Sequence, residues 1–239
     1  MPNGWQHLQK LVEDCHTRLD EQCARQLHTL SEQRVPIHCR PGCDNCCNLA
    51  VNATLPEALR ILPSLGAEQL ERISHHGEGL VEIARAAVDF KDYLRRRRRD
   101  LGACPLLEAD GQCGVYSLRP LACRALFSTR DSAWCAADFS ILHPAEKEAF
   151  LSSLDPRLVA FPTHYLAAPQ ELGRRLEDRI AETMAARWGF SVSGSLAFLL
   201  FLEQRCALSG LMEQGLAATT AALERAGYHL PVLIHAQPI

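Results

Sequence analysis

Eight of the eleven cysteines fall into two groups, one near residue 40 and one between residues 104 and 135. The first group lies in the segment CRPGCDNCC and contains Cys39, Cys43, Cys46 and Cys47. The second group contains Cys104, Cys113, Cys123 and Cys135. Short gaps that include Gly or Asn let a tight loop turn two thiolates toward one ion, as zinc and iron-sulfur sites require. The spacing therefore predicts a metal centre that uses up to eight thiolates.

The adjacent pair Cys46 and Cys47 adds a constraint on that centre. Neighbouring side chains of an extended backbone point to opposite sides, so the two sulfurs are predicted to face different metals or to bridge two. Eight thiolates divide into two sites of four, or into one four-ligand cluster with reserve ligands. Pro105 directly after Cys104 favours an iron-sulfur centre slightly over zinc, because iron-sulfur loops commonly contain a Cys-Pro junction. A polynuclear centre is the resulting hypothesis.

A centre of this kind needs positive charge nearby, because four thiolates on one Zn²⁺ leave a net charge of about −2. Arg40, Arg119 and Arg124 each lie within four residues of a cluster cysteine. We therefore expect these arginines to contact the bound cofactor, with Pro41-Gly42 as an additional backbone nest. The alternative is that each arginine is an ordinary surface side chain.

Other potential ligands have a simpler interpretation. The remaining cysteines lie in helical patterns and are interpreted as packing residues: Cys15, Cys23 and Cys206. Three histidines are interpreted as surface or helix-capping residues, although each could compete as a ligand: His38, His75 and His76. No catalytic residue is identified.

Composition narrows the class of protein. The formal charge of −3, from 25 basic and 28 acidic residues, disfavours a general nucleic-acid-binding surface. The N-terminus lacks the features of a secretory signal, and no stretch approaches the roughly 20 apolar residues of a membrane span. We therefore expect a cytoplasmic protein without membrane contact. In a reducing compartment a cysteine cluster more often binds metal or performs redox chemistry than forms disulfides.

The elements that must position these cysteines are mostly helical. Apolar periodicity predicts a long amphipathic helix over residues 5–33. A short strand is expected over 49–53, followed by a helix over 55–63 with Thr54 as its N-cap and Glu57 completing a capping box. Two further helices are predicted over 67–74 and 78–98. The second ends in five consecutive arginines, Arg95–Arg99, which are interpreted as a solvated last turn, with an acidic or phosphate partner as the alternative.

The second half of the sequence is expected to be helical. Helices are predicted over 144–154, 170–188, 195–208 and 210–226, and the apolar stretch Val192–Leu202 is interpreted as part of a buried core helix. The predicted fold is mainly α, with short β segments around a loop-rich cysteine cluster and a helical C-terminal half. Residues 1–142 are expected to form the metal-binding domain. Residues 143–239 form a helical region that is either separate from the first or continuous with it.

The combination of CRPGCDNCC with CPLLEADGQCGVYSLRPLACR resembles the YkgJ-type cysteine-cluster family, a zinc- or iron-chelating domain that also occurs in flagellin lysine N-methylase. The resemblance implies that the eight cysteines named above are the metal ligands. It implies a metal-binding protein that holds zinc, iron or an iron-sulfur centre, with a protein partner or substrate as a further expectation. The alternative that it implies is an S-adenosylmethionine-dependent protein lysine N-methylase with an iron-sulfur centre, so whether the protein is an enzyme is left open.

Overall fold

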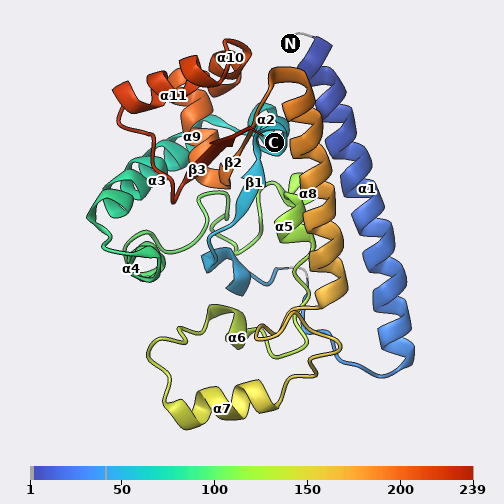
Figure 1. Ribbon diagram of the computed structural model, residues 1–239. Helices are drawn as coiled ribbons and strands as arrows, with labels where there is room; N and C mark the ends of the chain where they lie inside the picture. Colours follow the sequence, from blue (N-terminus) through green and yellow to red (C-terminus); the bar gives the residue numbers. More distant parts are fainter. Residues whose placement is uncertain (1–2, 41, 239) are drawn as a thin grey trace.

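The computed structural model describes residues 3–40 and 42–238 and is mainly helical (Figure 1). Two long helices, α1 (Asn3–Glu32) and α8 (Ala167–Trp188), pack antiparallel along one side of the molecule. Trp5 at the start of α1 stacks on Trp188 at the end of α8, with ring centroids 4.5 Å apart. The predicted amphipathic helix is confirmed, because Leu8, Val12 and Leu19 are all buried at helical spacing.

Three short strands form an antiparallel sheet in the order β1 (Asn52–Thr54), β2 (Ser191–Ser195) and β3 (Ile234–Gln237). Ala53 pairs with Gly194, and Gly194 pairs with Ile234. A Cβ atom at Gly194 would lie 2.2 Å from the carbonyl oxygen of Leu233, so only glycine allows the strands to approach this closely. The sheet thus joins segments that are far apart in the sequence.

The middle strand corrects one prediction. The stretch from Val192 was expected to be helical, but residues up to Ser195 form β2, and α9 (Leu196–Cys206) begins only after it. Strand pairing on both edges of β2 satisfies its backbone groups, and this non-local pairing overrides the local apolar pattern. Two short helices follow α9, α10 (Leu208–Glu213) and α11 (Leu216–Arg225). The helix predicted over 210–226 is therefore interrupted, and Gly215 at the interruption has a φ of 97°.

The predicted capping box is confirmed at the start of α2 (Leu55–Ile61), which is followed by the 3₁₀ turn η2 (Leu62–Ser64). The Glu57 carboxylate accepts hydrogen bonds of 2.8 Å from the backbone N–H and the hydroxyl of Thr54. Its other oxygen accepts a hydrogen bond of 2.8 Å from the backbone N–H of Leu121, the first residue of α5 (Leu121–Arg124). This buried carboxylate therefore positions the helix that carries Cys123.

The two helices predicted over 67–98 divide at a different place. A single helix, α3 (Ala67–Ala86), runs through the predicted break, and the chain instead breaks before α4 (Phe90–Arg96), where Asp89 caps the new helix. Gly77 lies where α3 contacts α9. A Cβ atom at this position would lie 2.3 Å from the Phe201 ring, so the contact requires a glycine. After α4 the chain forms a short π-helical turn, η3 (Arg97–Leu101).

Buried apolar side chains form two clusters of very different size. The main core includes residues on both sides of the predicted boundary at residue 142, from Trp5 to Ile234. The second cluster consists of Phe150, Leu154 and Val159, with partly buried neighbours that include Trp134. It belongs to residues 128–165, which contain α6 (Ala133–Ala136) and α7 (Pro144–Ser152) and lie at one end of the molecule (Figure 1). We call this segment the small lobe and the remainder the body. Among the described residues, no helix is long and apolar enough to cross a membrane.

Candidate metal centre

The first cysteine group lies in a loop that ends in a single 3₁₀ turn, η1 (Asn45–Asn48). The turn is closed by hydrogen bonds from Cys47 N–H to Asp44 (2.8 Å) and from Leu49 N–H to Cys46 (3.0 Å). Cys46 and Cys47 are therefore not in extended backbone, and the premise that their side chains point to opposite sides is wrong. In a 3₁₀ turn neighbouring side chains are about 120° apart, and the neighbouring Cys47 thiol raises the pKa of Cys46.

A hairpin brings the second group to the first. The backbone N–H of Cys104 donates to the carbonyl of Cys47 at 2.9 Å. From there Leu107 pairs with Cys113 across a turn in which the Asp110 carboxylate accepts a hydrogen bond from the Gln112 N–H. The chain then enters the 3₁₀ turn η4 (Tyr116–Leu118). Helix α3 holds this hairpin in place, because Arg72 binds both carboxylate oxygens of Glu108 at 3.1 Å.

Five thiols are treated as an inner group, of which Cys104 and Cys113 pack against the main core: Cys46, Cys47, Cys104, Cys113 and Cys123. Burial raises the pKa of Cys104 to about 11, and the thiolates of Cys113 and Cys46 act in the same direction. Burial also raises the pKa of Cys123 well above its ordinary value, and Cys104, Cys46 and Cys113 all add to that rise. These mutual effects require the sulfurs to lie close together.

The other predicted ligands form an outer group of Cys39, Cys43 and Cys135, at the junction between the body and the small lobe. Burial raises the pKa of Cys39, and the thiolates of Cys135, Cys46 and Cys43 add to this rise. The N–H of Ser128, which donates to the Cys39 sulfur at 3.2 Å, lowers the same pKa. Burial likewise raises the pKa of Cys135, with the Cys46 and Cys43 thiolates adding to it. Cys46 thus affects the pKa of thiols in both groups.

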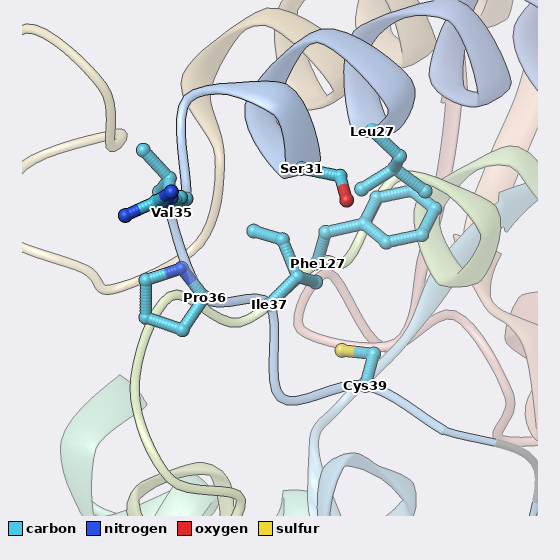
Figure 2. Close-up of a pocket in the computed structure, with 8 residues that line it drawn as sticks. Leu27, Ser31, Val35, Pro36, Ile37, Cys39 and Phe127 are labelled. Carbon is cyan, nitrogen blue, oxygen red and sulfur yellow. The ribbon is translucent and has the colours of Figure 1, made fainter.

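The outer group lies beside an open hollow. Cys39 is exposed at one side of this hollow, which has a volume of about 470 Å³ and a mostly apolar wall that includes Ile37 and Phe127 (Figure 2). Cys135, by contrast, is buried. Its sulfur lies 3.4 Å from Nε2 of His164, and burial lowers the pKa of that imidazole to about 4.

The arginines predicted to contact the cofactor occupy different environments. Arg119 lies near the inner group, where its positive charge lowers the pKa values of Cys46, Cys113 and Cys123 against the larger effect of burial. Its guanidinium carbon is 3.6 Å from the centroid of the Tyr116 ring.

Arg124 instead donates hydrogen bonds to Asp20 on α1 and to the carbonyls of Ser117 and Arg119, which ties α5 to α1. Arg40 is exposed. Pro41, half of the predicted backbone nest, lies outside the described residues.

Sequence reasoning missed a cation in the arginine run. Arg97 is 6% exposed, and its Nη1 donates to the carbonyl of Asn48, next to Cys47, at 2.7 Å. Burial lowers its pKa, which the nearby Tyr93 and Cys104 oppose. The signal was the spacing of Tyr93, Arg97 and Leu101, which places Arg97 on the side of the helix that faces the body.

The donor set fits a thiophilic metal such as zinc or iron. All eleven cysteines are free thiols. The segments that carry the predicted ligands are joined by hydrogen bonds from Cys104 N–H to the Cys47 carbonyl and from Ser128 N–H to the Cys39 sulfur. Within residues 3–40 and 42–238, no group of three or more Cys, His, Asp or Glu side chains already surrounds a common metal position. Thiols bind zinc and iron as thiolates, so a metal would replace the protons that burial keeps on these sulfurs.

Comparison with known proteins agrees with this chemistry. Residues 38–140 match the family model CxxCxxCC, described as a putative zinc- or iron-chelating domain. Searches among curated proteins and among solved structures found no match. The matched segment begins just before Cys39 and ends just after Cys135, so it includes all eight predicted ligands. The match supports the predicted resemblance: over residues 38–140 the chain is similar to this family of cysteine-cluster domains.

Proposed function

We propose that this protein binds zinc or iron through its eight clustered cysteines, in two neighbouring sites formed by the inner and the outer group. One observation carries the proposal: the backbone N–H of Cys104 donates to the carbonyl of Cys47 at 2.9 Å, and α6, which carries Cys135, packs against η1, so the two cysteine groups meet at this turn. Cys46 belongs to the same turn, where one thiolate could bridge metals of the two sites.

The local charges support a thiolate centre. Several thiolates on a divalent ion leave a net negative charge that must be offset. Arg119 and Arg97 both interact electrostatically with inner-group sulfurs, and Arg97 also fixes the carbonyl that follows Cys47. Metal binding would draw the thiols into coordination distance and release their protons, so affinity for the metal is coupled to folding of the surrounding loops.

The experiment is a metal count on full-length protein purified with and without oxygen. We expect about two metal equivalents per chain by elemental analysis, and their loss when Cys46 is replaced by Ser. Cys206→Ala is the matched control, since Cys206 lies on α9 outside both groups. Protein that retains no zinc or iron under either condition, and takes none up on reconstitution, would contradict the proposal.

Visible absorption separates the two metals. Iron-sulfur clusters absorb broadly in the visible through sulfur-to-iron charge transfer, whereas zinc thiolates are colourless. The Cys104-Pro105 junction favours the iron-sulfur form for the inner group. A colourless protein with stoichiometric zinc would exclude it.

The lysine N-methylase activity that the family resemblance implies needs S-adenosylmethionine in addition to a metal. Its sole support is the resemblance, whereas metal binding has the convergence of thiols behind it. Calorimetric titration of the metal-loaded protein with S-adenosylmethionine is the test, and we expect no saturable heat. A saturable signal would favour the methylase instead. The free cysteines fit a reducing compartment such as the cytoplasm.

A further inference from the structure

The outer group has one ligand fewer than a tetrahedral site needs. It contributes three thiols, Cys39, Cys43 and Cys135, whereas structural zinc sites have four protein ligands. The inner group, by contrast, has five thiols. A fourth donor for the outer group must therefore be shared from the inner group or come from a residue other than the eight cysteines.

His164 lies in the right place to supply that donor. It is 4% exposed, and its Nε2 is 3.4 Å from the sulfur of Cys135, which is 6% exposed. The residue lies beyond the matched segment, which ends at residue 140. No pattern in the sequence around it suggested a ligand.

The residues at the two ends of the small lobe fix the position of His164 relative to Cys39. Ser128 pairs with Tyr165, and both the N–H and the hydroxyl of Thr129 donate to the carbonyl of His164, at 3.0 and 2.9 Å. On its other side the same segment donates from Ser128 N–H to the sulfur of Cys39 at 3.2 Å. Cys39 and His164 are thus held by two adjacent residues, Ser128 and Thr129.

Packing in the lobe also fixes the imidazole. The His164 ring meets Phe150 edge to face with centroids 5.7 Å apart, and Phe150 belongs to the small apolar cluster. His164 has little rotamer freedom, because its backbone carbonyl is hydrogen-bonded and its ring is packed. A preorganised ligand is held in the same way.

We propose that Nε2 of His164 completes, with Cys39, Cys43 and Cys135, a tetrahedral Cys₃His site for a divalent zinc or iron ion. The inference rests on the proposed function and adds a ligand to one of its two sites. Compared with a four-thiolate site, the imidazole replaces one negative charge, so the outer site would carry a net charge of about −1. The cations near the thiols, Arg97 and Arg119, interact with the inner group, which has the greater negative charge.

The test uses Co²⁺ bound to the full-length protein, because cobalt d–d absorption reports the number of sulfur and nitrogen ligands. Replacement of His164 by Ala should weaken one of the two metal equivalents by more than about 100-fold and leave the other unchanged. Replacement of His164 by Cys should restore both equivalents, with the spectrum moved toward that of two all-sulfur sites. His28→Ala is the matched control, because His28 is an exposed histidine on α1.

A measurement on the unmutated protein covers the case in which the variants do not fold. Cadmium-loaded protein should show coupling between the metal and the imidazole ring protons of a single histidine. Unchanged cobalt stoichiometry and spectrum in His164→Ala, or no metal-to-imidazole coupling, would overturn this inference. The proposed function would still stand in that case, because it fails only if wild-type protein and the Cys46→Ser variant bind equally little metal.

Discussion

The body and the small lobe each hold part of the thiol cluster, but they differ in what else stabilises them. In the body, the Cys104–Cys113 hairpin is bound by Arg72 of α3, and α5 is bound by Glu57 and, through its own Arg124, by Asp20 of α1. Large buried side chains surround this scaffold. The inner thiols therefore lie on a structure that apolar burial can stabilise without metal.

The small lobe has far less to stabilise it. Its cluster contains three buried apolar residues, and its two ends are joined by an isolated bridge between Ser128 and Tyr165. At 38 residues it falls below the roughly 40 residues under which a folded unit usually needs a metal or a disulfide. Metal binding would thus have a different role at each site. The inner site lies on a body that is folded without metal, whereas metal at the outer site would connect the lobe to that body.

The largest expected effect is on the lobe when metal is removed. Chelation, or replacement of Cys135 by Ser, should raise amide exchange within residues 128–165 by more than about 100-fold, because metal binding supplies much of the local folding free energy. Amides of α1, α8 and α9 should keep their protection. Hydrogen exchange followed by mass spectrometry measures both regions, with Cys206→Ala as the control. Equal loss of protection in body and lobe would show one cooperative unit and break the distinction.

The second effect concerns the buried cation of the body. Replacement of Arg97 by Met removes the hydrogen bond to Asn48 and the positive charge beside Cys104, and should cost about 3 kcal/mol of unfolding free energy. It should also weaken metal binding at the inner group more than at the outer group. Arg99→Met, at an exposed position of the same run, should change stability by less than about 0.5 kcal/mol. Urea unfolding compares the two, and equal costs would mean that burial of Arg97 is unimportant.

Arg97 and His164 also show which features the sequence could and could not predict. The capping box at Thr54 and the long helix over 5–33 depend on local spacing, and both are confirmed. The cysteine groups could be recognised because their ligands are close in sequence. Arg97 was missed because a run of like residues hides the one that faces inward. His164 was missed because Cys135, its contact, is 29 residues away.

Backbone hydrogen bonds, non-local in one case and local in the other, explain the two remaining differences. The residues of β2 form a strand because β1 and β3, from opposite ends of the chain, pair with both of its edges. Likewise Cys46 and Cys47 turn in a 3₁₀ helix because Asp44 and the following loop close a local hydrogen-bonded turn. A one-dimensional pattern of apolar residues contains neither kind of information.

The third effect is a pH response that belongs to the body. Glu177 of α8 lies in a hollow between the loop after Cys47 and α5, and one of its carboxylate oxygens has no hydrogen-bond partner. Burial raises its pKa to about 8, with Glu57 and Asp178 adding to the rise, while the Ala122 N–H and Arg174 oppose it.

The native state therefore keeps a proton that the unfolded chain loses near pH 4.5. Stability should fall as pH rises from about 4.5 to 8, by up to about 1.4 kcal/mol per pH unit. Glu177→Gln should flatten this profile and be more stable than wild type at pH 8, with little change in exchange of the lobe. Thermal unfolding between pH 5 and pH 9 measures it. Parallel profiles for variant and wild type would show that Glu177 keeps an ordinary pKa.

The smallest effect is kinetic and follows from exposure. Cys39 in the outer group is exposed beside an open hollow (Figure 2), whereas Cys104 and Cys123 of the inner group are partly buried. A coloured chelator should therefore remove the outer metal about tenfold faster than the inner one, which corresponds to about 1.4 kcal/mol in activation free energy. Alkylation of metal-depleted protein should reach Cys39 before Cys104. A single rate for both metals would mean that Cys46 bridges the sites so tightly that they release metal as one centre.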